Sequence, residues 1–418
     1  MLTGVFGMNV INSQNGGKGH RLYVLTLAAL TFTFTLAMQQ ICMTVLFKEI
    51  AEDLGMSLVE VGIVWGMPNF AGLLVVFFAG LVTDRFGAPR VMGIACILSG
   101  IFGAIRGTTD DFFSLALFTF LFGVSMWVIP SSVFKTTATW FSGRKLVIAN
   151  GVVSAGMGLG FTVGALISAT TLSPLLGSWR GVLFLYGGIS ILFGLLWLLT
   201  VKEHAQVHLG AALTRVPLRQ SIARVFPIKS IWLLGLTMLG FSGCVQGVIG
   251  YLPTYLRDIG WTVASADGSL TVFNALSTLG VVPMALLSAK IGLRKAVAFP
   301  VLIVTIVGVA LLPLVGSAMV WVIMIIMGVA RDGFMAVTLT ISTETEGVGV
   351  VYAGTAMGLT QTLMSLGGLS SPALGNSLAD PANPAAPYPF FLWAAFGLLA
   401  LVAFCFVKET GWRDKPRL

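Results

Sequence analysis

Charged residues are scarce in this chain. Asp, Glu, Lys and Arg together make up 10% of its 418 residues, whereas 56% of the residues are hydrophobic. A soluble domain carries about 25% charged residues, because its surface faces water. A disordered chain would be more polar still, and a collagen-like chain would show a glycine at every third position. The composition excludes these classes and indicates a protein whose natural solvent is lipid.

Groups that bind metals or move protons are equally few. The four cysteines fall inside apolar stretches without the spacing of a zinc site. We expect all four to be buried free thiols, and they are Cys42, Cys96, Cys244 and Cys405. The three histidines lie in polar segments, which argues against a histidine relay inside the membrane. No glycine run has the strand-to-helix context of a phosphate-binding loop. We therefore expect no cofactor, no metal and no drive by ATP.

Long apolar runs dominate the rest of the sequence. A transmembrane helix requires about 20 consecutive apolar residues, and twelve segments near this length follow Arg21. In chain order they are Leu22–Leu46, Val59–Val82, Val91–Ile105, Phe112–Phe134, Val147–Thr170, Val182–Leu199, Ile231–Leu252, Leu270–Leu287, Val297–Val315, Val320–Ile341, Val351–Leu374 and Phe390–Val407. The sequence therefore predicts an all-α integral membrane protein with twelve transmembrane helices, numbered here in this order.

The positive charges are unevenly distributed between the loops. Lysine and arginine are disfavoured in short loops that must cross the membrane during insertion. Most of the 24 lysine and arginine residues fall on the side of the two termini, so we expect both termini in the cytoplasm. The net charge of +8 reflects this bias, and no nucleic-acid partner is needed to explain it. The expected location is the inner (plasma) membrane of a prokaryote.

A basic polar segment, Lys202–Lys229, divides the chain into two halves. We expect a cytoplasmic tail at 1–20, a six-helix bundle at 21–201, a cytoplasmic linker at 202–229, a second six-helix bundle at 230–408 and a tail at 409–418. The halves repeat at an offset of about 205 residues, for example in Val201-Lys202-Glu203 and Val407-Lys408-Glu409. Two halves that both start on the cytoplasmic side predict parallel six-helix pseudo-repeats around an axis along the membrane normal.

The loop between the second and third helices carries a motif. Gly80, Asp84, Arg85 and Gly87 follow the spacing Gly-x-x-x-Asp-Arg-x-Gly, and Arg90 supplies a later base. Together with the twelve segments and the repeat, this motif resembles the major facilitator superfamily of secondary transporters over residues 21–408. In that family the loop belongs to a gate, so the resemblance implies gating roles for these five residues. The alternative is that Asp84 only caps a helix at a simple turn.

Two differences from the drug/proton antiporters of this family narrow the choice of subfamily. Drug/proton antiporters of the family commonly carry an arginine in helix four and a Gly-Pro pair in helix five. Leu121–Trp127 lacks the first and Gly151–Gly160 lacks the second, which makes drug export less favoured. The glycine-rich faces of helix five and of Gly354–Gly368 in helix eleven resemble anion carriers, including nitrate/nitrite, cyanate and organic-acid transporters. Glycines this dense also predict close helix packing.

Two charged residues lie far from any predicted loop. Arg331 and Asp332 fall near the middle of helix ten, where even the lowest estimates put the cost at roughly 2.5–3.5 kcal/mol for each charge. We expect both side chains to face a cavity. Arg331 would clamp a carboxylate or similar anion in a bidentate manner, and Asp332 would either carry a proton or orient Arg331. The alternative is an adjacent ion pair that only neutralises itself.

The repeat also pairs polar residues of the two halves. Gln40 corresponds to Gln246, and Asn69 corresponds to Asn274. An amide in an apolar segment needs a partner or a wet cavity, so matched amides predict a shared central cavity that binds substrate. The alternative is that each amide only links two helices. Trp127 in helix four either stacks on a substrate or packs between helices.

We expect a secondary transporter and not an enzyme, because no nucleophile with a neighbouring base is visible. The predicted function is alternating-access transport of a small anion, such as a monocarboxylate or a similar organic or inorganic anion, coupled to protons or to exchange. One alternative is a carrier of a neutral or cationic solute, drug export included, with Asp332 as ligand or proton site. Another is a passive channel, which would need a continuous polar lining. Expected partners are the anion, a proton or counter-substrate and the lipid bilayer, and the protein is expected to be a monomer.

Overall fold

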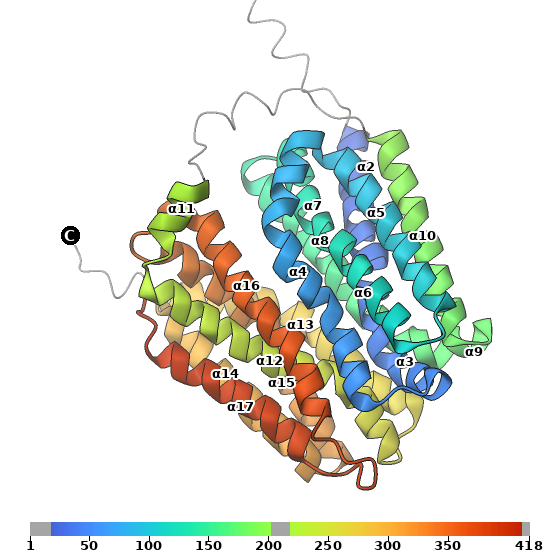
Figure 1. The fold of residues 1–418 in the computed structure, drawn as a ribbon. Helices are drawn as coiled ribbons and strands as arrows, with labels where there is room; N and C mark the ends of the chain where they lie inside the picture. Colours follow the sequence, from blue (N-terminus) through green and yellow to red (C-terminus); the bar gives the residue numbers. More distant parts are fainter. Residues whose placement is uncertain (1–17, 202–217, 412–418) are drawn as a thin grey trace, which may run out of the picture.

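The protein is represented by a computed structural model that describes residues 18–201 and 218–411. Within these ranges all regular elements are helical, and no strand occurs. Most of the two expected tails and much of the expected linker at 202–229 lie outside the described residues. The described part contains two groups of helices, one before residue 202 and one after residue 217 (Figure 1).

The first group runs from α2 to α10. Its elements are α2 (Lys18–Leu30), η2 (Thr31–Met38), α3 (Gln39–Leu54), α4 (Leu58–Phe86), α5 (Ala88–Ile105), η3 (Arg106–Thr108), α6 (Phe112–Met126), α7 (Val128–Trp140), α8 (Gly143–Ile167), η4 (Ser168–Leu172), α9 (Ser173–Leu176) and α10 (Trp179–Thr200). Several of these pieces follow one another without a loop. The pieces α2, η2 and α3 form one crossing unit, and α6 with α7 form another.

The second group runs from α11 to α17. Its elements are α11 (Leu218–Val225), α12 (Lys229–Asp258), α13 (Val263–Ile291), α14 (Arg294–Leu311), η7 (Leu312–Leu314), α15 (Ser317–Glu344), α16 (Gly349–Asn376) and α17 (Tyr388–Cys405). The short α11 contacts α16. The other α-helices of this group are long enough to cross a hydrocarbon core of about 30 Å.

Eleven helical segments in the described ranges are long and apolar enough to cross a membrane. The remaining long helix, α16, has 28 residues and is rich in glycine, serine and threonine. It packs against both α12 and α4, so protein covers much of its surface and a lipid-like composition is not needed. The predicted all-α membrane fold is confirmed, and α16 is the predicted eleventh helix.

The helices extend beyond the predicted apolar segments, and this corrects one expectation. Helix α12 continues to Asp258 and α13 begins at Val263, whereas the sequence predicted a loop across 253–269. Arg257 and Asp267 therefore lie within helices, where they form an ion pair with side-chain exposures of 6% and 0%. Both residues lie near helix ends, as the sequence analysis allows for charges outside the middle of a span, so they are a buried ion pair of a different kind from Arg331 and Asp332 near the middle of α15.

One of the four cysteines also departs from the prediction. Cys42, Cys96 and Cys244 are buried free thiols, as expected. Cys405 is free but exposed, because it is the last residue of α17 and its side chain faces outward. An apolar neighbourhood in the sequence does not distinguish a lipid-facing position from a core position.

The first crossing unit contains an unusual turn. Residues Thr31–Met38 are π-helical, between the α-helical segments α2 and α3. Helix α8 packs closely against this unit through a face of glycines. A Cβ added at Gly156 or Gly160 would lie 2.5 Å or 2.4 Å from a backbone oxygen of the first unit. Thr33 Oγ1 also donates to the Gly156 carbonyl at 2.8 Å. The glycine-rich sequence of helix five thus serves close packing.

A single residue makes the turn between α4 and α5. Gly87 has φ = +87°, in a region that side chains with a Cβ rarely adopt, and it separates Phe86 at the end of α4 from Ala88 at the start of α5. Pro89 follows within the first turn of α5, where its missing N–H is tolerated. The predicted tight turn is present at this position.

The two halves touch over one part of their length. We call the end of the bundle that holds Phe86, Thr200 and Lys229 the linker side, and the other end the far side. On the far side, Asn376 Nδ2 donates to the Leu58 carbonyl at 2.8 Å, and a Cβ at Gly62 would lie 2.8 Å from the backbone of α16. Helices α4 and α16 converge there and diverge toward the linker side (Figure 1). The halves are therefore closed on the far side.

One ion pair bridges the halves at the far side. Lys48 Nζ, near the end of α3, lies 2.7 Å from Asp258 Oδ1 at the end of α12, and both side chains are partly exposed. We expect Lys48→Asp to favour opening on the far side, since it replaces attraction with repulsion. An exposed pair contributes about 1 kcal/mol at most, so its loss should change the conformational population by roughly fivefold or less.

Pulsed electron paramagnetic resonance can measure that change. Spin labels at Glu52 and Ser377, both exposed near the far side, report the separation of the halves in a cysteine-free background. Lys48→Asp should add a population at longer distance, and the double exchange Lys48→Asp with Asp258→Lys should remove it again. An unchanged distance distribution in the single variant would show that this pair does not hold the far side closed.

A second charged contact ties the chain after α17 to the second half. The Glu409 carboxylate accepts hydrogen bonds from the backbone N–H groups of Arg294 and Lys295 at 2.8 Å and 2.9 Å, and so caps α14. Its oxygen Oε1 also accepts from the N–H groups of Thr410 and Gly411. Partial burial raises the pKa of Glu409, but these four backbone bonds together lower it below its ordinary value of 4.5.

The cap makes a prediction about stability. Glu409→Gln should lower the stability of the protein by about 0.5–2 kcal/mol at neutral pH, which is the usual effect of losing a helix cap. A lowered pKa stabilises the folded state above the ordinary pKa of the group, and that contribution is lost as the pH falls through the folded-state pKa. The difference in thermal midpoint between wild type and Glu409→Gln should therefore shrink below pH 4.5. A difference that stays constant with pH would contradict the cap.

Candidate functional site

A central cavity of about 750 Å³ lies between the two halves. Residues from both halves line it, from the first crossing unit, α4, α6 to α8, α12, α13, α15 and α16. The wall extends from the middle of these helices toward the linker side, where Asn150 of α8 and Leu339 of α15 belong to it. Because the halves meet on the far side, this cavity opens toward the linker side.

Arg331 and Asp332, the two charged residues near the middle of α15, both line the central cavity. Arg331 Nη1 is 3.4 Å from Asn274 Oδ1, and Arg331 Nε is 3.7 Å from Asp332 Oδ1. The guanidinium carbon also lies 5.4 Å from the centre of the Phe273 ring. The side chains of Arg331 and Asp332 are 20% and 36% exposed, so both reach the open space. The loose ion pair leaves N–H groups of Arg331 available to a ligand.

The structure brings the four matched amides together. Gln40, Asn69, Gln246 and Asn274 all line the central cavity, two from each half. Gln40 and Gln246 are half-buried, whereas Asn69 and Asn274 are buried. Asn274 is engaged within the protein, because its Nδ2 donates to the Leu270 carbonyl at 3.0 Å and its Oδ1 faces Arg331. The amides therefore add polar groups at several points of an otherwise largely apolar wall.

Trp127 also lines the cavity, and it has a structural partner. Its Nε1 donates to the Pro68 carbonyl at 2.7 Å, and its ring packs so closely on α4 that a Cβ at Gly72 would lie 2.6 Å from it. Pro68 lies inside α4, so this bond ties the indole to the backbone of that helix. One edge of the indole is thus fixed between helices, and a stacking role remains a prediction.

The loop residues predicted to form a gate lie far from the cavity. Gly80, Asp84 and Arg85 fall in the last part of α4, Gly87 forms the turn and Arg90 begins α5. Arg85 and Arg90 are exposed, and the Arg85 guanidinium lies over the Phe86 ring at 5.5 Å. In the described part of the chain, no ion pair joins Arg85 or Arg90 to the second half. These positions are on the linker side, which is the open side, and their gating role stays a prediction.

Two cavity residues were missed by the sequence analysis. Gln361 of α16 lines the cavity, and its buried Oε1 has no hydrogen-bond partner within the described residues. Asn150 of α8 lines it too, and its Oδ1 accepts from Thr137 Oγ1 at 2.8 Å. The criterion that selected Gln40, an amide within an apolar segment, also selects both of these residues. They were missed because neither has an amide at the matching position of the other half.

Comparison with known sequences identifies a family and related proteins. The family model described as Major Facilitator Superfamily matches residues 27–372. The hexuronate transporter of Bacillus subtilis is 22% identical over 216 residues, which are 50% of this chain and 50% of the relative. A probable nitrate/nitrite antiporter of Thermus thermophilus, NarK1, is 26% identical over 251 residues, or 57% and 54% of the two chains. The chain spans about half the length of the curated relatives it matches.

Solved structures agree on the fold over nearly the whole chain. A bacterial homologue of the human lysosomal transporter Spinster, in an inward-facing and unoccupied conformation, matches with a TM-score of 0.75 at 15% identity. The match covers 94% of this chain and 97% of that one. The nucleoside transporter NupG matches with a TM-score of 0.76 at 14% identity, over 93% and 99% of the chains. With a family match over most of its length and this fold, the chain belongs to the major facilitator superfamily and is a membrane transporter.

Proposed function

We propose that this transporter carries a small anion by secondary active transport, and that Arg331 is its main ligand. The observation that carries the proposal is the position of Arg331. Its guanidinium reaches a large cavity at the middle of the bundle, and the one carboxylate that pairs with it among the described residues, that of Asp332, is 3.7 Å away. A planar guanidinium matches two oxygens of a carboxylate or nitrate-like anion. An arriving anion would therefore find a ready partner with unused donors.

The relatives support an anion as cargo. Hexuronate is named for the Bacillus subtilis relative, and galactarate and D-glucarate are named for a probable transporter of Escherichia coli that is 26% identical over 171 residues. Nitrate and nitrite are named for the Thermus thermophilus relative. All of these solutes carry negatively charged oxygens. A site with one arginine and several amides fits a carboxylate whose remaining polar atoms bond to the amides.

The closed far side and open linker side support alternating access. With the linker side in the cytoplasm, as the distribution of positive charge predicts, the structure is an inward-open state. Rocking of the two halves about the central cavity would close the linker side and open the far side. Transport is driven by a proton or by a counter-substrate. Asp332 is the candidate for the residue that carries the proton, because it is the only acid among the described residues of the cavity wall. A monomer is sufficient for this cycle, since the cavity is complete within one chain.

A ligand screen on the purified protein tests the proposal. A solute that binds the native state raises the thermal midpoint by mass action. We expect stabilisation by small carboxylates or by nitrate-like anions and none by neutral sugars or amines at equal ionic strength. Stabilisation by an amine that depends on Asp332 would instead favour the carrier of a cationic solute.

A further inference from the structure

Arg106 is a buried charge that transport by the central cavity does not use. It belongs to the short turn η3 after α5, and the whole residue is 1% exposed. Its Nε donates to the Gly103 carbonyl and its Nη2 to the Gln39 carbonyl, both at 3.4 Å. The guanidinium carbon lies 4.2 Å from the centre of the Phe122 ring. Two long bonds leave most of its five N–H donors without a protein acceptor.

Within the described residues, no acid compensates this charge. The acids nearest to Arg106 in sequence are engaged elsewhere, because Asp110 pairs with Arg180 at 3.1 Å and Asp111 caps α6 by accepting from the Ser114 N–H. Cys42 is also buried nearby, but its thiol donates to the same Gln39 carbonyl and is therefore uncharged. A buried, uncompensated cation destabilises a protein by several kcal/mol. An anion bound beside Arg106 would therefore compensate its charge and stabilise the protein.

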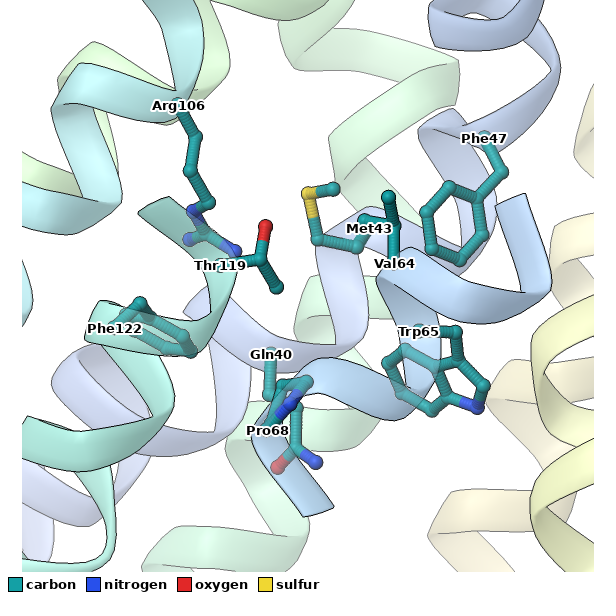
Figure 2. Close-up of a pocket in the computed structure, with 9 residues that line it drawn as sticks. All are labelled: Gln40, Met43, Phe47, Val64, Trp65, Pro68, Arg106, Thr119 and Phe122. Atoms are coloured by element: carbon teal, nitrogen blue, oxygen red, sulfur yellow. The ribbon is translucent and has the colours of Figure 1, made fainter. Parts of the chain in front are cut away.

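A small cavity of about 10 Å³ adjoins the guanidinium. Arg106, Thr119 and Gln40 provide its polar groups, and Met43, Val64 and Phe122 provide much of its apolar wall (Figure 2). Thr119 is 2% exposed, and its Oγ1 has no hydrogen-bond partner within the described residues. The cavity is therefore lined by two nearly fully buried groups with donors to spare, a guanidinium that uses only part of its N–H groups and a hydroxyl without a partner.

The size of the cavity limits the kind of anion. A single water needs roughly 10–15 Å³ on the same scale, so the cavity has room for at most one small occupant, and a halide ion, which is somewhat larger than water, needs a small shift of the flexible Met43 side chain. A carboxylate or a phosphate is too large, and a water molecule would leave the charge of Arg106 uncompensated. A halide ion accepts hydrogen bonds from N–H and O–H groups and requires no donor function of its own.

We propose that the cavity beside Arg106 is a binding site for a resident halide ion, with Arg106 and Thr119 as its ligands. The site lies within the first half, where α3, α4, η3 and α6 meet. It is separate from the Arg331 site, although Gln40 and Trp65 line both cavities. The bound ion compensates Arg106 and so stabilises the first half of the transporter. The proposal does not depend on which solute the central cavity carries.

Two measurements on the full-length protein in detergent test the site. Thermal unfolding is followed against increasing sodium chloride or bromide, with methanesulfonate holding the ionic strength constant. Wild type should show a saturable rise of the thermal midpoint with either halide. Arg106→Gln should abolish the rise, and the nearly isosteric Thr119→Val should raise the half-saturating halide concentration by roughly tenfold, the effect of one lost hydrogen bond to an ion. Crystals grown in bromide should show an anomalous peak between Arg106 and Thr119.

The outcomes separate this site from the substrate site. Arg331→Ala should keep the full halide effect, even though it is expected to lose the transported anion. The proposal is overturned if wild type shows neither a halide-specific rise nor a bromide peak. It is also overturned if Thr119→Val and Arg106→Gln both keep the wild-type response, because the ion would then bind elsewhere. If Arg106→Gln does not fold, Thr119→Val and the bromide peak still decide.

Discussion

Arg331→Ala should bind the transported anion at least about 100-fold more weakly than wild type, which corresponds to roughly 3 kcal/mol. Arg331 is the only base among the described residues that line the central cavity. Its guanidinium makes one long hydrogen bond to Asn274 and a loose ion pair with Asp332. These contacts orient the guanidinium but leave some of its N–H donors available to a ligand. Isothermal titration with the best solute from the ligand screen measures the loss directly.

Arg331→Lys is the matched control for this prediction. Lysine keeps the positive charge but lacks the planar fork that bonds two oxygens at once. We expect an affinity between those of wild type and Arg331→Ala, with a larger loss for planar carboxylates than for a monatomic anion. If Arg331 only neutralises Asp332, Arg331→Ala would lower the thermal midpoint but leave affinity unchanged. In that case Arg331→Ala combined with Asp332→Asn would restore the midpoint.

Asp332→Asn should abolish accumulation of the anion driven by a pH gradient, so that the accumulation ratio falls to about 1. Accumulation needs a group that takes a proton with the substrate, and Asp332 reaches the cavity with 36% of its side chain exposed. Asparagine has nearly the same shape but cannot change its charge. Exchange of labelled for unlabelled anion does not require net proton movement, so Asp332→Asn should still exchange. Proteoliposomes with an imposed pH gradient measure both processes.

The two assays distinguish a proton site from a positioning role. If Asp332 only orients Arg331, Asp332→Asn should weaken binding and slow exchange while gradient-driven accumulation persists. If the transporter is driven by a counter-substrate alone, neither wild type nor Asp332→Asn would respond to the pH gradient. Asp332→Glu, which keeps the carboxyl group, should retain accumulation at a reduced rate.

Much of the architecture follows from the sequence because lipid imposes a simple rule. Every crossing helix must be long and largely apolar, so segments such as Val182–Leu199 stand out against charged loops. The matched amides predict which distant parts of the sequence lie close together, because residues at equivalent positions in two repeats lie near the same axis. This argument predicts that Gln40 and Gln246 line one cavity, and the structure places both on the wall of the central cavity. Helix ends were less predictable, because helices continue beyond the hydrocarbon.

The missed features depend on local geometry. Arg106 follows the apolar segment Val91–Ile105, so the sequence places it in a loop. The turn η3 instead folds its side chain back between α3 and α6, where Phe122 covers it. Gln39 and Gln40 are equivalent by composition, yet Gln39 is buried and donates to the Tyr186 carbonyl at 2.7 Å while Gln40 lines the cavity. Which of two neighbours faces inward depends on the exact helical phase, and the π-helical turns before them shift that phase.

The π-helical residues Thr31–Met38 make this stretch unusually tolerant of a one-residue deletion. Each residue of an α-helix turns the chain by about 100°, and a π-helical turn absorbs one residue more than an α-helical turn. Losing a single residue here would let a π-helical turn return to regular α geometry and would leave α3 in nearly the same rotation relative to α2. Gln40 would then stay on the cavity wall, whereas the same loss in a regular α-helix would move the following side chains by about 100°. A one-residue gap in this helix between two related transporters is therefore compatible with an unchanged binding site.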